Sequence, residues 1–285
     1  MQRTGVSSMT FPPTAENFAE LARVGIIDYE LSLSYRDCER VSAAAVAALA
    51  RASGVKVLSY HLPFAEPDVL DLSSESTETR RRTVALFCKL IKRGAEAGIR
   101  RFIVHPSGEP VTTDPIRRAH RIAIAKDTLA SLAEVAALHG AVIAVENLPR
   151  TCLGSTVSEM EALVSGSEKL SVCFDTNHLL TDSEELFIER LGHRIRALHI
   201  SDYDRINERH WMPGEGDINW HGLYRRLLST GFDGVWLYEV LPRPKTILRE
   251  RELTPSDLAR NAGEIFSGHR ITTFSRRIDG LGMWP

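Results

Sequence analysis

Acidic and imidazole side chains stand at the ends of short apolar segments in this 285-residue chain. Such segments read as buried strands, which would ordinarily end in hydrophobic residues. Three carboxylates that converge from neighbouring strand ends would repel one another at low dielectric, and a bound cation would remove that repulsion. The residues at these ends are His61, His105, Glu146, Asp175, His178, His199 and Glu239.

Four of these residues, Glu146, Asp175, His199 and Glu239, are the predicted metal ligands. A single one of them could be a hydrogen-bonded core residue, but the set together favours a metal over a structural polar network. Three carboxylates and one imidazole make an oxygen-rich site with one nitrogen, which suits Mn²⁺, Zn²⁺, Co²⁺ or Mg²⁺. We therefore expect a divalent metal ion as the cofactor.

The elements that must position these ligands alternate along the chain, strand then helix, as parallel strands joined by crossover helices do. The expected strands are Thr4–Ser8, Ile27–Leu33, Val55–His61, Arg101–His105, Val142–Asn147, Ser171–Asp175, Ala197–Ser201 and Val235–Val240. The expected helices are 14–23, 37–53, 76–98, 114–139, 157–166, 183–192, 219–230 and 255–267.

Eight strands and eight helices predict an α/β fold, a single (β/α)₈ TIM barrel over residues 1–267. A doubly wound open sheet is the alternative, but no GxGxxG motif follows the first strand. Residues 268–285 fall outside this count, and we expect this C-terminal tail to pack on the barrel or on a partner subunit.

Glycines and one capping sequence mark the predicted helix boundaries. Glycine fits the left-handed position after a helix, and it stands after four of the predicted helices, at Gly54, Gly98, Gly140 and Gly231. The segment 254–257, Thr-Pro-Ser-Asp, offers a capping threonine, a proline at the first helical position and an acidic residue in the first turn.

Charge and cysteine usage exclude several classes of partner. The chain has 35 basic and 37 acidic residues, a net charge of -2, so no basic field favours nucleic acid or a membrane surface. The four cysteines are far apart and form no CxxC pair, so we expect reduced, structural thiols. No signal sequence or membrane-length apolar run is evident, and we expect a cytoplasmic protein.

The segment 201–220 after the seventh strand is longer than most connections in a barrel, which is typical of a functional loop. It contains Arg209 and His210, a cation and an imidazole that could bind hydroxyl or phosphate oxygens of a substrate.

With these motifs, the sequence resembles the xylose isomerase-like TIM-barrel superfamily. Within it, the sequence is similar to the sugar phosphate isomerase/epimerase branch, which is related to endonuclease IV. The resemblance spans residues 4–267 and rests on the motifs AVENLP, FDTNH, LHISD, HWMPGEG and LYEV. It implies a cytoplasmic isomerase or epimerase of carbohydrate metabolism that acts on a small sugar and forms a homo-oligomer.

The same resemblance implies roles for the residues. Glu146 and Glu239 would be the catalytic acid and base, which exchange a proton beside a carbonyl through an enediolate at the barrel mouth. The bound metal would polarise that carbonyl. Substrate contacts would come from five further residues, His61, His105, His178, Arg209 and His210.

Endonuclease IV offers a second reading, a three-zinc phosphoesterase. Its nine ligands would match the four predicted metal ligands and five possible extra ones, His61, His105, His178, Glu208 and His210. Glu208 stands where that family carries aspartate. A lyase or dehydratase that uses the same one-metal site on a keto sugar, and a sugar-binding protein without catalysis, are the remaining alternatives.

Overall fold

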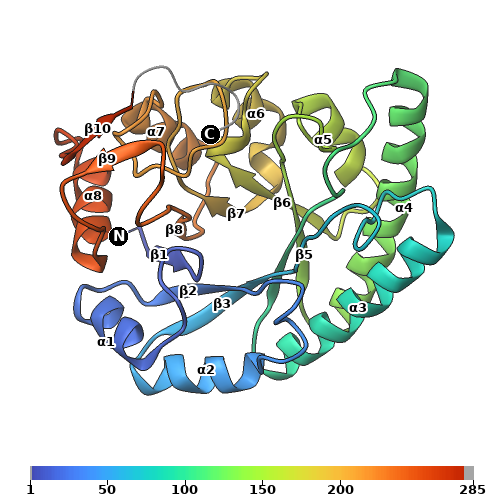
Figure 1. Ribbon diagram of the computed structural model, residues 1–285, viewed down its shortest axis with the longest axis horizontal. Coiled ribbons are helices and arrows are strands. Elements are labelled where there is room, and N and C mark those ends of the chain that lie inside the picture. Colours follow the sequence, from blue (N-terminus) through green and yellow to red (C-terminus); the bar gives the residue numbers. More distant parts are fainter. Residues whose placement is uncertain (1, 279–285) are drawn as a thin grey trace.

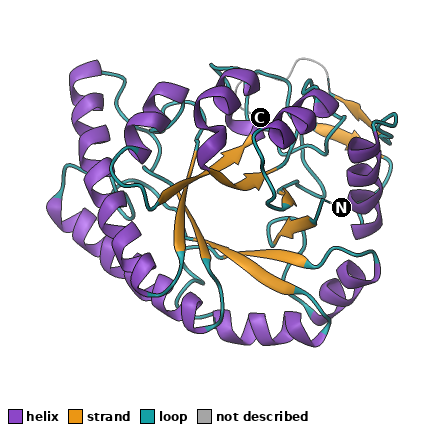
Figure 2. Cartoon of the chain, turned by 180° about the vertical axis from the view of Figure 1, so that it is seen from behind, coloured by secondary structure: helices purple, strands orange, loops and turns teal. Residues whose placement is uncertain are grey.

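Eight parallel strands form the centre of the protein, and eight α-helices surround them, in a computed structural model that describes residues 2–278 (Figures 1 and 2). The strands are β1 (Thr4–Ser7), β2 (Asp28–Ser32), β3 (Lys56–His61), β4 (Arg101–Val104), β5 (Val142–Glu146), β6 (Leu170–Asp175), β7 (Ile195–His199) and β8 (Trp236–Tyr238). The helices are α1 (Ala15–Arg23), α2 (Ala43–Ala52), α3 (Thr77–Glu96), α4 (Pro115–Leu138), α5 (Val157–Val164), α6 (Glu184–Leu191), α7 (Trp220–Ser229) and α8 (Pro255–Ser267). The predicted (β/α)₈ barrel is confirmed.

The sheet closes on itself. Its strands follow the order β7-β6-β5-β4-β3-β2-β1-β8, with parallel pairing between neighbours. Ile200 joins the two ends, because its N–H donates to the Leu237 carbonyl at 2.8 Å and its own carbonyl accepts from the Glu239 N–H at 3.1 Å. All eight strand ends therefore face one mouth.

Small and apolar side chains fill the barrel interior directly below that mouth. Ile103, Ala144, Cys173 and Ala197 form a buried cluster of their own, separate from the large core between strands and helices. Side chains two positions apart point to the same face of a strand. The next inward positions, at the strand ends, are His105, Glu146, Asp175 and His199.

The predicted helix boundaries follow the glycine signals. Gly54, Gly98, Gly140 and Gly231 all have positive φ, from 63° to 94°, as a left-handed residue after a helix requires. At the start of α8, the backbone N–H of Thr254 donates to the Asp257 carboxylate at 2.9 Å, which closes the predicted cap.

Two local expectations differ from the structure. The second helix was expected over 37–53, but α2 begins at Ala43, because Ser42 caps it and residues 35–40 form turns. Two three-residue strands, β9 (Ile247–Arg249) and β10 (Ser275–Arg277), pair antiparallel outside the barrel and were not expected.

The C-terminal segment is described as far as residue 278, and it lies against the long loop after β7. Arg277 of β10 donates to the Glu215 carbonyl and to the Asp217 carboxylate of that loop, both at 2.7 Å. Residues 279–285, the rest of the expected tail, lie outside the described residues. No helix among residues 2–278 is both long enough and apolar enough to cross a membrane.

Candidate metal centre

Four buried side chains converge at the centre of the barrel mouth. Glu146, Asp175, His199 and Glu239 each offer one ligand atom within 4.8 Å of the others, and all four are at most 4% exposed. The Nδ1 atom of His199 lies 2.9 Å from Glu146 Oε1 and 2.9 Å from Glu239 Oε2. The four predicted metal ligands therefore come from β5, β6, β7 and the end of β8, and they surround one point.

Asp175 shows most directly that this point suits a cation. Two asparagines hold it in place: Asn147 accepts from its backbone N–H at 2.8 Å, and the Asn177 N–H donates to its Oδ1 at 2.7 Å. Its other oxygen, Oδ2, is buried without any hydrogen-bond donor among the described residues. An unpartnered buried carboxylate oxygen is costly, and a metal ion in the middle of the group would satisfy it.

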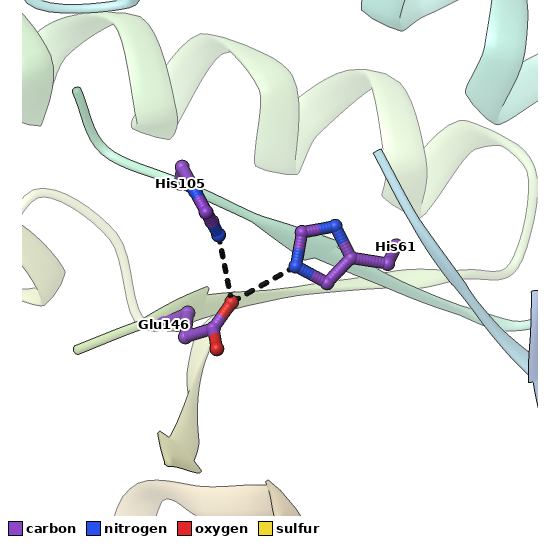
Figure 3. Close-up of side chains that lie close together, drawn as sticks. All are labelled: His61, His105 and Glu146. Atoms are coloured by element: carbon purple, nitrogen blue, oxygen red, sulfur yellow. Dashed lines mark hydrogen bonds and ion pairs between the residues drawn. The ribbon is translucent and has the colours of Figure 1, made fainter. Parts of the chain in front are cut away.

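Two further histidines lie on the second oxygen of Glu146 (Figure 3). Glu146 Oε2 is 3.0 Å from His61 Nε2 and 3.1 Å from His105 Nε2. The two rings meet edge to face, with their centroids 4.9 Å apart. His61, His105 and Glu146 thus form a second group of candidate ligands that shares Glu146 with the first.

A third group lies beside these two, and the loop after β7 supplies two of its members. Glu208 Oε1 is 2.8 Å from His210 Nε2 and 3.5 Å from His178 Nε2, and the ligand atoms of all three residues lie within 4.8 Å. The other carboxylate oxygen of Glu208 accepts from Arg150 at 2.8 Å. The nine residues proposed from the sequence as ligands therefore form three neighbouring groups.

Three of the histidines are oriented in the same way. The Nδ1 atom of His61 lies 2.8 Å from the Leu62 carbonyl, that of His178 lies 2.9 Å from the Asn147 carbonyl, and that of His210 lies 3.0 Å from the Glu239 carbonyl. A carbonyl can only accept, so each Nδ1 carries a proton. In the neutral ring each Nε2 then turns a lone pair toward a carboxylate, an arrangement that a metal ion between them stabilises.

In the metal-free site, the neighbouring charges decide which histidines and carboxyl groups carry a proton. Burial disfavours the charged form of His61, but the bound Glu146 carboxylate more than offsets this and raises its pKa to about 9. His210 behaves alike, because Glu208 outweighs burial and raises its pKa to about 9. Burial, with Glu146 and Glu239 nearby, raises the pKa of Asp175 to about 7. Protons on His61 and His210 thus balance the carboxylates, and a bound cation would displace them.

Glu30 belongs to this site although sequence reasoning missed it. This β2 residue is 1% exposed, and its Oε1 lies 2.9 Å from His199 Nε2, while Ser59 donates to its Oε2 at 2.7 Å. His199 can therefore donate Nε2–H to Glu30 and present Nδ1 to the metal position. A glutamate in the middle of the otherwise apolar segment Tyr29–Leu31 was the available signal.

Arg209, expected at the substrate, lies in none of the three groups. It is 3% exposed, and its Nε donates to Asp204 Oδ2 at 2.9 Å, within the same loop. Its backbone N–H donates to Asn177 at 2.8 Å, which ties the loop to the end of β6. The structure therefore places its guanidinium within the loop.

Cys173 lies close to Glu146 and His199 below the metal position. Burial raises the pKa of its thiol, so the thiolate that a metal would need is disfavoured. All four cysteines are free, as the sequence indicated.

A cavity of about 470 Å³ opens over the metal centre. His105, His178 and Glu208 line its inner end, and the exposed rings of Tyr35 and Phe64 line its outer part. A volume in this range admits a small molecule.

Both the sequence and the fold are similar to those of known proteins. A family model described as xylose isomerase-like TIM barrel matches residues 6–257. Among curated proteins, the chain is 29% identical to "Probable endonuclease 4" of Thermoplasma acidophilum over 195 residues, which cover 62% of this chain and 64% of that one. It is 32% identical over 80 residues to "Fructoselysine 3-epimerase" of Escherichia coli O157:H7, which cover 25% of this chain and 29% of that one.

The chain thus spans less than two thirds of the curated relatives that it matches. Among solved structures, a D-tagatose 3-epimerase-like protein superposes with a TM-score of 0.76 at 23% identity, with 94% of this chain and 96% of that one covered. A D-psicose 3-epimerase gives 0.74 at 18% identity, with 94% and 98% covered. These similarities in structure show the fold, and the match over residues 6–257 shows that the chain belongs to the xylose isomerase-like TIM barrel family.

Proposed function

We propose that this protein is a divalent-metal-dependent sugar isomerase or epimerase. The observation that carries the proposal is the pair of buried glutamates at one metal position, since Glu146 and Glu239 both lie 2.9 Å from His199 Nδ1. Proton exchange beside a carbonyl requires one group that takes the proton and one that returns it. The sugar epimerases of like fold and the fructoselysine 3-epimerase of partly similar sequence support this choice.

The residues of this chain would divide the work as follows. Burial raises the pKa of Glu239, but the adjacent His199 outweighs burial and lowers it to about 2, so Glu239 is ionised, as the group that takes the proton must be. Ser7 donates to its other oxygen at 3.4 Å and fixes its orientation. Glu146 would return the proton. A divalent ion held by Glu146, Asp175, His199 and Glu239 would supply Lewis-acid polarisation of the substrate carbonyl.

The cavity residues would select and hold the sugar. His105 and His178 line the cavity and can bind hydroxyl groups, while His61 and His210 lie beside them in the ligand groups. Arg209 would act through the loop that it braces. A lyase reaction would use the same glutamates, if the substrate carried a leaving group on the carbon next to the one that loses its proton.

A second candidate, a multi-metal phosphoesterase, is favoured by one specific observation. Both oxygens of Glu146 are engaged, Oε1 in the first ligand group and Oε2 with His61 and His105. If Glu146 bridges two ions, it has no free oxygen with which to move a proton. The chemistry would then be hydrolysis with several metals, in line with the sequence similarity to endonuclease 4.

Metal content distinguishes the two candidates. We would measure it by elemental mass spectrometry on protein purified without chelator, for the wild type, His105→Ala and the control His120→Ala, which changes an exposed histidine of α4. The isomerase proposal predicts one ion per chain and no loss in either variant. Two or three ions, with one lost in His105→Ala, would support the phosphoesterase.

Activity is tested on the same proteins. The isomerase proposal predicts that deuterium from D₂O enters a ketose at the carbon beside its carbonyl, as seen by NMR across a panel of keto sugars. Glu239→Gln should abolish the exchange. Cleavage of bis(4-nitrophenyl) phosphate, without exchange into any sugar, would overturn the proposal in favour of the phosphoesterase.

A further inference from the structure

A second cavity lies outside the barrel, between the start of α2 and the last two turns of α3. These ends of the two helices lie next to each other (Figure 1). Its volume is about 390 Å³. Residues 38–44 and α3 form its walls, and Tyr60 of β3 lines it from the barrel side. Successive side chains of a strand point to opposite faces, so Tyr60 and its neighbour His61 face different sites. The cavity is therefore separate from the metal centre.

Tyr60 provides the first sign that this cavity binds a ligand. The residue is 1% exposed, and its hydroxyl has no hydrogen-bond partner among the described residues. Its ring lies against the helix, because a methyl group at Gly94 of α3 would come within 3.5 Å of it. A buried hydroxyl without a partner is rare in folded proteins. A ligand oxygen in the cavity would provide that partner.

Two arginines supply positive charge at the same place. Arg40 and Arg93 both line the cavity, and neither guanidinium has an ion pair or hydrogen bond within residues 2–278. Glu39, also in the wall, is paired with Lys89, so its charge is already balanced. Two exposed arginines that form no ion pair within 4 Å among residues 2–278 therefore stand at the cavity.

The N-terminus of α2 adds backbone donors. Ser42 caps this ten-residue helix by accepting from the Ala45 N–H at 3.3 Å. The first N–H groups of a helix have no partner within the helix, and the helix dipole favours an anion beside them. Ala43 and Ala44, the first two residues of α2, line the cavity.

We propose that this cavity binds a phosphate group, either as free phosphate or as part of a small organic phosphate. Arg40 and Arg93 would pair with its charged oxygens, the α2 amides would donate to it, and the Tyr60 hydroxyl would donate from the floor. Glu96, the remaining acidic residue of the lining, repels the anion and so weakens its binding.

The test is isothermal titration calorimetry of the metal-loaded protein with sodium phosphate and, separately, with glycerol 3-phosphate. Charge-assisted hydrogen bonds are among the strong ones, so Arg93→Gln should lower the affinity at least tenfold. Tyr60→Phe should lower it severalfold, and Glu96→Gln should raise it. The control Lys92→Gln changes an exposed cation next to Arg93 that does not line the cavity, and it should bind as the wild type does.

The two probes distinguish free phosphate from an organic phosphate, and the variants distinguish binding in this cavity from binding at the metal centre. Tighter binding of glycerol 3-phosphate than of phosphate identifies an organic phosphate as the ligand, and equal binding identifies the free ion. Absence of binding of both probes at millimolar concentration overturns the proposal. Equal binding by the wild type, Arg93→Gln and Tyr60→Phe also overturns it, because the phosphate would then be bound at the metal centre.

Discussion

Asp202 is the internal anchor of the loop that carries Glu208 and His210. Its carboxylate is fully buried and accepts four hydrogen bonds: from Tyr203 N–H at 2.9 Å and Ile218 N–H at 3.2 Å on Oδ1, and from Gly214 N–H at 2.8 Å and Trp220 Nε1–H at 2.7 Å on Oδ2. Each oxygen therefore faces two donors. An Asp202→Asn variant has the same shape, but its amide nitrogen must face one of these two pairs.

The expected loss follows from that geometry. Two hydrogen bonds are lost and two buried donors are left without acceptors, at about 1–3 kcal/mol each, so the free energy of unfolding should fall by about 2–6 kcal/mol. The measurement is urea unfolding with EDTA present, at pH 8. This pH lies well above the value of about 6 to which burial, opposed by the hydrogen bonds from Trp220 and the backbone, raises the Asp202 pKa. The wild-type carboxyl is then ionised.

Asp217→Asn is the matched control in the same loop. Asp217 is exposed, and its carboxylate pairs with Arg277 at the surface, so its loss should cost less than about 1 kcal/mol. Equal stability of the two variants would refute the anchoring role of Asp202.

Three further changes test other parts of the fold. Gly216→Ala should lower the free energy of unfolding by about 1–3 kcal/mol in urea, because the added methyl would overlap the Asp202 carboxylate, and wild-type stability would contradict this. Gly263→Ala should raise it by about 0.5–1 kcal/mol, since this α8 position is helical and a methyl there meets nothing within 4 Å. Glu30→Gln should weaken metal binding about tenfold in competition with a chelator, because the partner of His199 Nε2 loses its charge, and unchanged affinity would show that Glu30 does not support the site.

The barrel and the convergence of four candidate metal ligands at its mouth could be predicted from the sequence because their signals are local and periodic. Glu146, Asp175 and His199 each end a strand whose preceding inward residue is small or apolar, so the break in the pattern is visible in the sequence. The glycines after the helices are equally local, because a left-handed residue is required there whatever the rest of the chain does.

The missed features depend on contacts between distant segments. Glu30 lies in the middle of β2, and its role is visible only once His199 stands beside it, 169 residues later in the chain. The β9 and β10 strands have three residues each, too few for a period, and their pairing is fixed by the fold around them. The start of α2 was misplaced because the turn residues before Ser42 also suit a helix. The division of the nine candidate ligands into three groups, two of which share Glu146, likewise depends on contacts that only the folded chain brings together.

The contacts of β10 with the long loop after β7 bear on the order in which the protein folds during its synthesis. Arg277 holds Asp217, which precedes it by 60 residues. On the ribosome, Glu208 and His210 emerge well before the strand that fastens their loop. A nascent chain can therefore close the barrel strands and gather the candidate ligands, with the loop already held by Asp202 and Asn177, before Arg277 adds the last surface contact to it.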